Sequence, residues 1–347
     1  MIAIHGLWPT MVRRIVQGDV LDISFSKRSI EALVSRAEKP GEGTFNAFSV
    51  VEGIQVAIAA LLFLAFSYVL GDVFLVLASV ETDAPASYTQ VPGEIIDEET
   101  EGPKYPGMSA RPITSSLRST CHRLLSIDGK KSLFRGLSCF VAYRLADYPI
   151  TFLLGLIPFM PKIASACIAS LLTMQLRAAW THIVISEPSA KPFWRRLPRF
   201  NLVLRATAIP TVILGSITGF EQVVVGSIVT SIVGLTPIGI LLLLIFHTVY
   251  TFVAIIPAKV VLARVQASLL PEEDRPIILL DPVFDQQKAE GKEYISTHEA
   301  SQSVSRATRN RLCMLYVKFY GLSFLAFNLV GVVGYLETII ARKFKAA

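Results

Sequence analysis

The chain has 347 residues, of which 52% are hydrophobic and only 17% are charged. Soluble domains carry about 25% charged residues, so this composition excludes an ordinary soluble domain. The net charge of +6 is spread over several loops without a dense basic patch, which argues against nucleic-acid binding and suits anionic lipid headgroups. The four cysteines are scattered without a CxxC pair, so we expect buried thiols rather than disulfides or a zinc site.

The chain begins with a polar segment, residues 1–47, that lacks the apolar core of a secretory signal. Six apolar blocks follow, and each is long enough for the about 20 residues that a membrane-spanning helix needs. They cover residues 48–80, 137–160, 163–186, 201–235, 237–263 and 313–341. The sequence therefore predicts an all-α, polytopic membrane protein. Its six-helix membrane domain is expected over residues 48–341, before a short basic tail, residues 342–347.

Two long polar loops interrupt the membrane domain, residues 81–135 and 268–311. Residues 81–110 are acidic and rich in proline and glycine, which is typical of disorder, whereas residues 112–127 have the pattern of a short amphipathic helix. Basic residues collect in the loops after the first, third and fifth blocks, and the other two loops contain almost none. This asymmetry predicts that the three basic loops share one side of the membrane, with both termini on the other.

A short unit recurs where the even-numbered blocks begin. Residues 134–137 (FRGL) and 194–197 (WRRL) are each followed by an arginine and then a proline, namely Arg144 and Pro149, and Arg205 and Pro210. Residues 319–322 (FYGL) keep the aromatic residue, the glycine and the leucine. Aromatic and basic side chains suit a membrane interface, and glycine permits a sharp turn into a helix. We interpret the unit as an internal repeat, and three independent interfacial anchors are the alternative.

This organisation resembles the mitochondrial carrier family of solute transporters. The string Asp128-Gly129, four residues, then Phe134-Arg135-Gly136 matches that family's second-half repeat motif at every position. The first-half motif, a proline with an acid two residues on and bases at the fifth and seventh positions, is matched only in part by "PAKVVLARVQ". The residues that carry the resemblance are Asp128, Gly129, Phe134, Arg135, Gly136, Trp194, Arg195, Pro257, Arg264 and Gln266.

The resemblance implies three carrier-like helix pairs, solute transport and a mitochondrial membrane, with another endomembrane as the alternative location. Lys259 stands where the family has an acid, and Arg177 occupies the same place in the third block. The acid–base pairs that close the gate in this family are therefore not expected in their usual form. The chain also resembles fungal multi-pass membrane proteins of unknown function.

Ionisable residues inside the apolar blocks are the candidate functional residues, because a charge at the bilayer centre costs at least about 2.5 kcal/mol. Arg144 and Asp147 lie three residues apart, so they could pair on one helical face. Basic groups that line one cavity would suit an anionic solute such as a carboxylate or a phosphate. The candidate substrate-binding residues are Arg144, Arg177, Arg205, Glu221 and Lys259.

Motifs of catalysis are absent from the sequence, which contains no Walker loop, HExxH or GxSxG. We therefore expect no enzyme activity, no metal site and no cofactor. One hypothesis is a carrier-like transporter of a small anionic solute with degenerate gate motifs. The alternative is a non-transporting scaffold or adaptor on a degenerate carrier fold, acting through protein or lipid contacts. Membrane lipids are expected partners in both, and the sequence names no protein partner.

Overall fold

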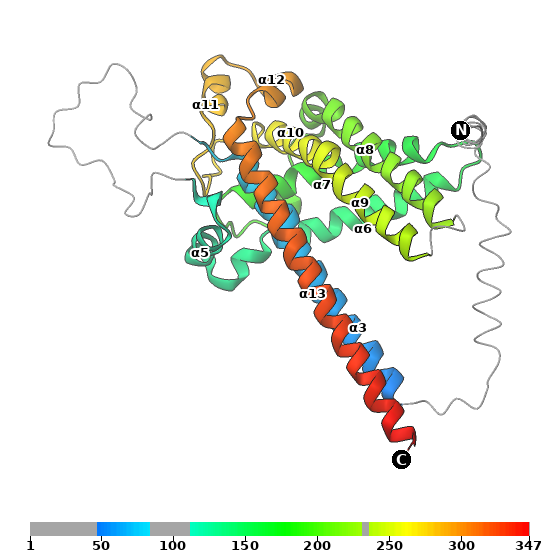
Figure 1. Ribbon diagram of the computed structural model, residues 1–347. Helices are drawn as coiled ribbons and strands as arrows, with labels where there is room; N and C mark the ends of the chain where they lie inside the picture. The colour runs from blue at the N-terminus through cyan, green and yellow to red at the C-terminus, as the bar shows by residue number, and fades with distance from the viewer. Residues whose placement is uncertain (1–46, 84–111, 231–235, 347) are drawn as a thin grey trace.

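The computed structural model describes residues 47–83, 112–230 and 236–346 (Figure 1). The predicted N-terminal segment and nearly all of the acidic stretch at 81–110 lie outside the described residues. Within the described residues the secondary structure is helical, apart from two isolated antiparallel β-bridges. The prediction of an all-α chain is confirmed for this part.

The helices follow the predicted blocks closely. The α-helices are α3 (Ala47–Phe66), α4 (Phe74–Val80), α5 (Leu117–Asp128), α6 (Leu137–Gly155), α7 (Lys162–Ile185), α8 (Phe200–Thr230), α9 (Pro237–Tyr250), α10 (Ile256–Ala267), α11 (Pro282–Ala289), α12 (Thr297–Gln302) and α13 (Arg306–Ala346). Two π-helical segments, η1 (Ser67–Val73) and η6 (Thr251–Ile255), join α3 to α4 and α9 to α10. The 3₁₀ turns are η3 (Ile113–Ser115), η4 (Gly129–Phe134) and η5 (Phe193–Arg195).

Five stretches of the described residues are long and apolar enough to cross a bilayer: Ala57–Val80, Leu117–Gly155, Lys162–Ile185, Phe200–Val229 and Leu241–Ala267. They correspond to the first five predicted blocks, and the sixth block lies within the single helix α13. Length and composition thus confirm a chain with several candidate membrane spans. Its grouping into three carrier-like pairs stays a prediction.

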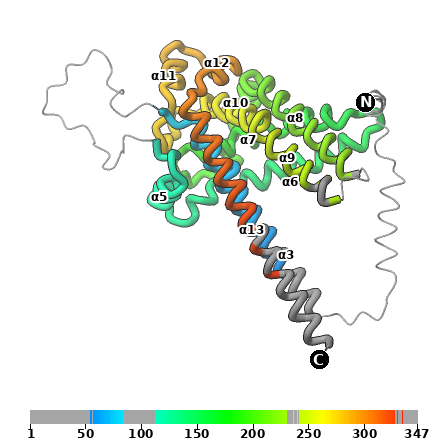
Figure 2. The backbone as a smooth tube through the Cα atoms, viewed as in Figure 1, coloured from blue at the N-terminus to red at the C-terminus, as the bar shows by residue number. Residues whose placement is uncertain are grey.

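The long helices form two diverging arms (Figure 1). Helices α3 and α13 run side by side as one arm, and α6, α7, α8 and α9 form the other. The arms meet where α4, α7 and α10 pack against one another, and Figure 2 shows the same convergence along the backbone. The C-terminal end of α13 lies far from this point (Figure 1).

The buried core lies at the convergence of the arms. Every residue of α4 is buried, and Val184 and Ile185 of α7 and Leu262 of α10 are fully enclosed. Large apolar side chains are exposed along the arms instead, for example Leu61 and Phe152, which are 66% and 67% exposed. Apolar surface on this scale is unfavourable in water, and it is the kind of surface that membrane proteins present to lipid chains.

Two β-bridges connect the segments after the first, third and fifth blocks at one end of the bundle. Glu81 pairs with Leu280 and Ser186 pairs with Pro276. The residue after each of α4 and α7 thus contacts the loop that follows α10. That the three basic loops share one side of the membrane stays a prediction, and most of the loop after the first block lies outside the described residues. The amphipathic helix predicted at 112–127 is confirmed as α5.

The recurring unit at the start of α6 has the backbone that the sequence predicts. Gly136 is the N-terminal flanking residue of α6 and has a left-handed conformation with φ of 68°. A Cβ atom there would lie 3.0 Å from Cδ1 of Trp180, so glycine is required by conformation and by space. The aromatic residues of the two units, Phe134 and Trp194, are 41% and 62% exposed, as interfacial side chains would be.

The cysteines are all free thiols, which agrees with the expected lack of disulfides. The expectation of burial is confirmed only for Cys139, because the other three are partly exposed. Cys167 instead lies where α8 crosses α7: a Cβ atom on Gly215 would approach its Cα to 3.0 Å.

Candidate functional site

The convergence of the arms contains a layer of three charged side chains. Lys259 Nζ lies 3.1 Å from Oδ1 of Asp72, and both residues line a small cavity together with Arg177. The cavity holds about 10 Å³, which is about the space that one water molecule requires. We call Asp72, Arg177 and Lys259 the central charge layer. Its cavity is too small for any solute larger than water.

The central charge layer draws one residue from each odd-numbered block. Asp72, Arg177 and Lys259 lie at matching positions, each eight residues before the last residue of its helix, namely Val80, Ile185 and Ala267. Because the helices converge at these last residues, side chains at an equal distance from them lie at the same level of the bundle. Two side chains closer to the same helix ends are hydrogen-bonded to each other: Thr181 Oγ1, one turn after Arg177, donates to Gln266 Oε1, two turns after Lys259, over 2.8 Å.

This arrangement refines the sequence analysis of the gate. The carrier-type gate network stays untested, but Lys259 does have an acidic partner. The partner is Asp72 of the first block, where no copy of the motif is recognisable. Asp72 is one of the ionisable residues inside the apolar blocks, yet it was not among the candidate substrate-binding residues. Its distance from the end of its block, equal to that of Arg177 and Lys259, was the available signal.

Arg144 and Arg177 are linked through one aromatic ring. Their guanidinium carbons lie 5.4 Å and 5.9 Å from the ring centroid of Tyr143. The predicted pairing of Arg144 with Asp147 is wrong, because Asp147 accepts a hydrogen bond of 3.1 Å from Thr173 Oγ1 and makes no ion pair with Arg144. Aromatic faces surround Arg144 instead, and cation–π attraction is strongest where water is excluded.

The remaining two candidate residues lie elsewhere. Arg205 is exposed on α8, in keeping with an arginine that extends toward an interface. Glu221 does not break its helix, because α8 is continuous, and its Oε1 lies 2.6 Å from Nδ1 of His247 on α9. The structure therefore gathers Arg144, Arg177 and Lys259 near the convergence, and it places Arg205 and Glu221 outside it.

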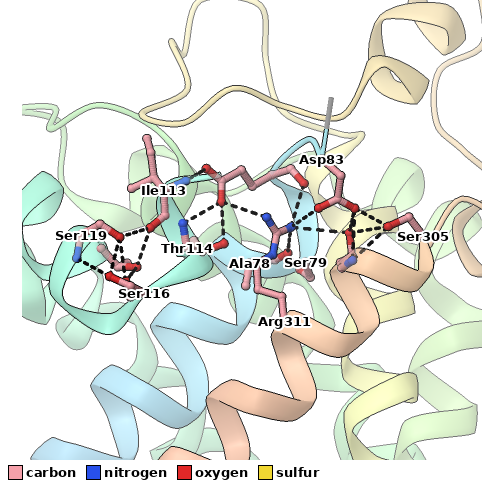
Figure 3. A network of polar contacts seen from close by, with 12 residues as sticks. Ala78, Ser79, Asp83, Ile113, Thr114, Ser116, Ser119, Ser305 and Arg311 are labelled. Carbon is pink, nitrogen blue, oxygen red and sulfur yellow. Dashed lines mark hydrogen bonds and ion pairs between the residues drawn. The ribbon is translucent and has the colours of Figure 1, made fainter. Parts of the chain in front are cut away.

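A second polar cluster joins the end of α4 to the start of α13 (Figure 3). Arg311 contacts both carboxylates of this cluster, Glu81 over 3.5 Å and Asp83 over 3.2 Å. Glu81 accepts hydrogen bonds from the amides of Ile113 and Thr114 over 2.6 Å and 2.9 Å. These residues hold the first block, η3 and the last helix together, so we interpret the cluster as structural.

Arg264, a residue of the predicted carrier-like motif, is also structural. Its side chain has no solvent exposure and donates to Asp281 Oδ2 over 2.9 Å, to the Ser79 carbonyl over 2.8 Å and to Ser303 Oγ over 3.0 Å. A buried arginine requires such a full set of acceptors. Its partners come from the first block and from the loop after α10, so Arg264 fastens the same end of the bundle.

A larger cavity of about 250 Å³ lies beside the recurring unit, between the start of α6 and the segment after α7. Arg135 lines it and is only 8% exposed. Its Nη2 donates to the Ser186 carbonyl, whereas Nε and Nη1 are buried without a partner in the described part of the chain. Lys131 and Lys191 add positive charge to the cavity, and Asp128 and Glu187 add negative charge. Unpartnered guanidinium nitrogens suit an acceptor-rich ligand.

No group of three metal-ligating side chains occurs among the residues that the structure describes. Comparison with known proteins found no matching family model, no matching curated protein and no matching solved structure. The geometry of the chain itself is therefore the basis for a functional proposal.

Proposed function

We propose that this multi-pass chain is a carrier-like transporter of a small anion, and that the central charge layer is the closed state of its anion site. The observation that carries the proposal is the meeting of two cations and one carboxylate, from three separate helices, around a single cavity. A charge inside a membrane segment is costly and usually faces the bundle interior or a water-filled cavity.

The balance of charge in this layer favours an anion. Asp72 pairs with Lys259, so one of the two cations is neutralised. Arg177 forms no ion pair with a carboxylate of the described residues, and its guanidinium group lies over the Tyr143 ring. The layer therefore has a net positive charge in a medium of low dielectric constant. A carboxylate or phosphate that reaches Arg177 would form a charge-assisted, bidentate hydrogen bond.

The closed cavity requires a conformational change during transport. A space for one water molecule cannot hold a carboxylate or phosphate, so the Asp72–Lys259 pair must separate before a solute reaches Arg177. A bound anion would replace Asp72 as the ion-pair partner of Lys259. Binding of the solute would therefore favour separation of the Asp72–Lys259 pair.

Uptake into proteoliposomes tests the proposal. The full chain is reconstituted, and uptake of radiolabelled succinate, acetate and inorganic phosphate is measured with Arg177→Ala, Arg177→Lys and, as the matched control, Arg205→Ala. We expect uptake of at least one anion, lost in Arg177→Ala, retained in part in Arg177→Lys and unchanged in Arg205→Ala. Weak uptake of every anion, with no loss in Arg177→Ala, would overturn the proposal.

The cavity at Arg135 favours the second candidate function, a non-transporting scaffold that acts through lipid contacts. Its two unpartnered nitrogens suit an anionic phospholipid headgroup at the membrane interface. Phospholipid that copurifies with the chain can be quantified for the natural sequence and for Arg135→Gln. Loss of anionic lipid in the variant, together with no transport by the natural chain, would favour the scaffold.

The proposed location is a mitochondrial membrane, supported by the complete motif over residues 128–136. Cell fractionation with tagged full-length protein tests this. Recovery of the protein in another endomembrane would overturn the proposed mitochondrial location but not the proposed anion site.

A further inference from the structure

Three side chains from three helices form a hydrogen-bonded chain away from the central charge layer. Glu221 of α8 contacts His247 of α9, with Oε1 and Nδ1 separated by 2.6 Å. On the other side of the imidazole, Nε2 lies 3.3 Å from the hydroxyl oxygen of Tyr320 on α13. Both ring nitrogens of His247 therefore have a partner.

This chain of contacts can hold a proton in two ways. When His247 is neutral with its proton on Nδ1, it donates to the Glu221 carboxylate and accepts at Nε2 from the Tyr320 hydroxyl. When a second proton binds at Nε2, that nitrogen becomes a donor and the Tyr320 oxygen becomes its acceptor. Gain or loss of the proton then needs only a rotation of the hydroxyl. The total charge of the Glu221–His247 pair changes between −1 and zero.

The charged and titratable groups around the pair come from three helices. Glu221 is the charged residue that faces His247 from α8, and Tyr320 is the titratable residue that faces it from α13. Tyr250 lies one turn along α9, and its hydroxyl donates to the Ile217 carbonyl over 2.9 Å. In the described residues, no lysine or arginine forms an ion pair with Glu221. An isolated negative charge in an apolar helix is costly, so one bound proton relieves this cost.

The two side chains of the pair differ in exposure. The side chain of His247 is 48% exposed, whereas that of Glu221 is 16% exposed. The imidazole is thus the more accessible group, and the carboxylate lies behind it. Imidazole suits a proton-binding role because one ring nitrogen can donate a hydrogen bond while the other accepts a proton.

We propose that Glu221 and His247 form a proton-binding site, and that the chain moves its anion together with a proton. The coupling rests on the proposed anion transport, whereas the proton site does not. The helix of His247 continues through η6 into α10, which carries Lys259 of the central charge layer. Movement of this rod would act on both sites. One proton on the Glu221–His247 pair would balance one negative charge on the solute.

An imposed pH gradient tests the coupling in proteoliposomes of the full chain, with succinate and inorganic phosphate as the probes. For coupling to one proton, an outside pH one unit more acidic should raise the accumulation ratio of the transported anion by up to about tenfold. Glu221→Gln and His247→Gln should abolish this increase and retain exchange at equal pH. Tyr250→Phe, the matched control on α9, should keep the increase. An equal increase in the two Gln variants would overturn the coupling.

Histidine NMR tests the proton site without transport. The full chain is labelled with ¹⁵N-histidine in nanodiscs, and His247→Gln identifies the resonance of His247. We expect this resonance to change with pH, and Glu221→Gln to alter that change. A resonance that is independent of pH, or the same in Glu221→Gln, would overturn the proton site. Absence of uptake by the natural chain would overturn the transport and the coupling alone.

Discussion

Lys259 and Asp72, 187 positions apart in the sequence, are joined by a contact of 3.1 Å between Nζ and Oδ1. Their side chains are only 22% and 19% exposed. The pair connects the first and fifth blocks at the point where the arms meet. A partly buried charge that loses its ion-pair partner destabilises the folded protein, so the two residues should be energetically coupled.

Removal of one member of this pair should destabilise the protein more than removal of both. We expect Lys259→Met to lower the free energy of unfolding by up to about 3 kcal/mol, because Asp72 loses its ion-pair partner and Arg177, which lines the same cavity, forms no ion pair with it. The double variant Lys259→Met with Asp72→Leu should recover most of that loss. Chemical denaturation in mixed micelles measures the difference. Additive losses in the double variant would show that the two charges are not energetically coupled.

Substitution of Arg264 should destabilise the protein much more than substitution of the exposed Arg205. Arg264→Met leaves Asp281 and the Ser79 carbonyl without their donor, and we expect a loss of about 3–5 kcal/mol in stability. The matched control is Arg205→Met, at an exposed position, which should change stability by no more than about 0.5 kcal/mol. Thermal unfolding in detergent compares the two. Equal unfolding midpoints would contradict a structural role for Arg264.

Alanine substitutions at Gly136 and Gly291 should distinguish destabilisation caused by backbone conformation from destabilisation caused by a steric clash. Gly136 and Gly291 have φ of 68° and 70°, but only a Cβ atom on Gly136 would meet a neighbour, Cδ1 of Trp180 at 3.0 Å. Gly291→Ala should therefore cost about 1 kcal/mol from conformation alone. Gly136→Ala should cost about 1–3 kcal/mol more, because Trp180 must move. Tryptophan fluorescence and thermal unfolding detect both effects. Equal losses would show that Trp180 yields without cost.

The contact between α7 and α8 should tolerate no side chain at Gly215 or Gly219. A Cβ atom at these positions would lie 3.0 Å from the backbone of Cys167 and of Ile163, respectively. Gly215→Val should lower stability by about 1–3 kcal/mol because two helix backbones must separate. Gly226→Val, on the same helix, would meet nothing within 4 Å and serves as the control. A comparable loss in both variants would point to helix propensity rather than contact.

The capping box of α12 should be sensitive to acid. The amide of Ser296 and the ammonium group of Lys292 hydrogen-bond to Glu299 and lower the pKa of its carboxyl group from 4.5 to about 2. A lowered pKa in the folded state stabilises α12 above pH 4.5, and this contribution is lost as the pH falls from 4.5 to about 2. Hydrogen-exchange protection, corrected for intrinsic rates, should decrease over this range.

The variant Glu299→Gln provides the control for this prediction. Its side chain cannot lose a proton, so the protection of α12 should be lower at neutral pH and should vary less between pH 4.5 and 2. A decrease of the same size in both proteins would place the acid sensitivity outside the capping box.

The sequence predicted the parts of the fold that depend on neighbours along the chain. Apolar blocks, the amphipathic helix α5 and the turn at Gly136 are local features, so composition, spacing and residue type were sufficient. Glu221 was a candidate substrate-binding residue because it lies inside an apolar block, whereas its partner across the bundle, His247, is shown only by the structure.

The pairing between distant segments was not predictable in the same way. Local spacing suggested that Arg144 pairs with Asp147. In the structure, Arg144 contacts aromatic rings, and Asp147 accepts a hydrogen bond from the hydroxyl group of Thr173. Asp72 has no motif around it, so its place beside Lys259 depends on how the helices converge. The unpartnered nitrogens of Arg135, Nε and Nη1, were not predictable either. They depend on the distant Ser186, whose carbonyl accepts a hydrogen bond from Nη2 alone.

The two β-bridges impose an order on biosynthesis. A nascent chain emerges N-terminus first, so α4 and α7 are complete well before the ribosome reaches Pro276 and Leu280. Until then the Val80 carbonyl and the Thr82 amide, and likewise the Ile185 carbonyl and the Glu187 amide, lack the partners that the bridges provide. Contacts between distant segments also form slowly, because a long loop must close first. The late loop therefore completes an assembly of helices that were made long before it.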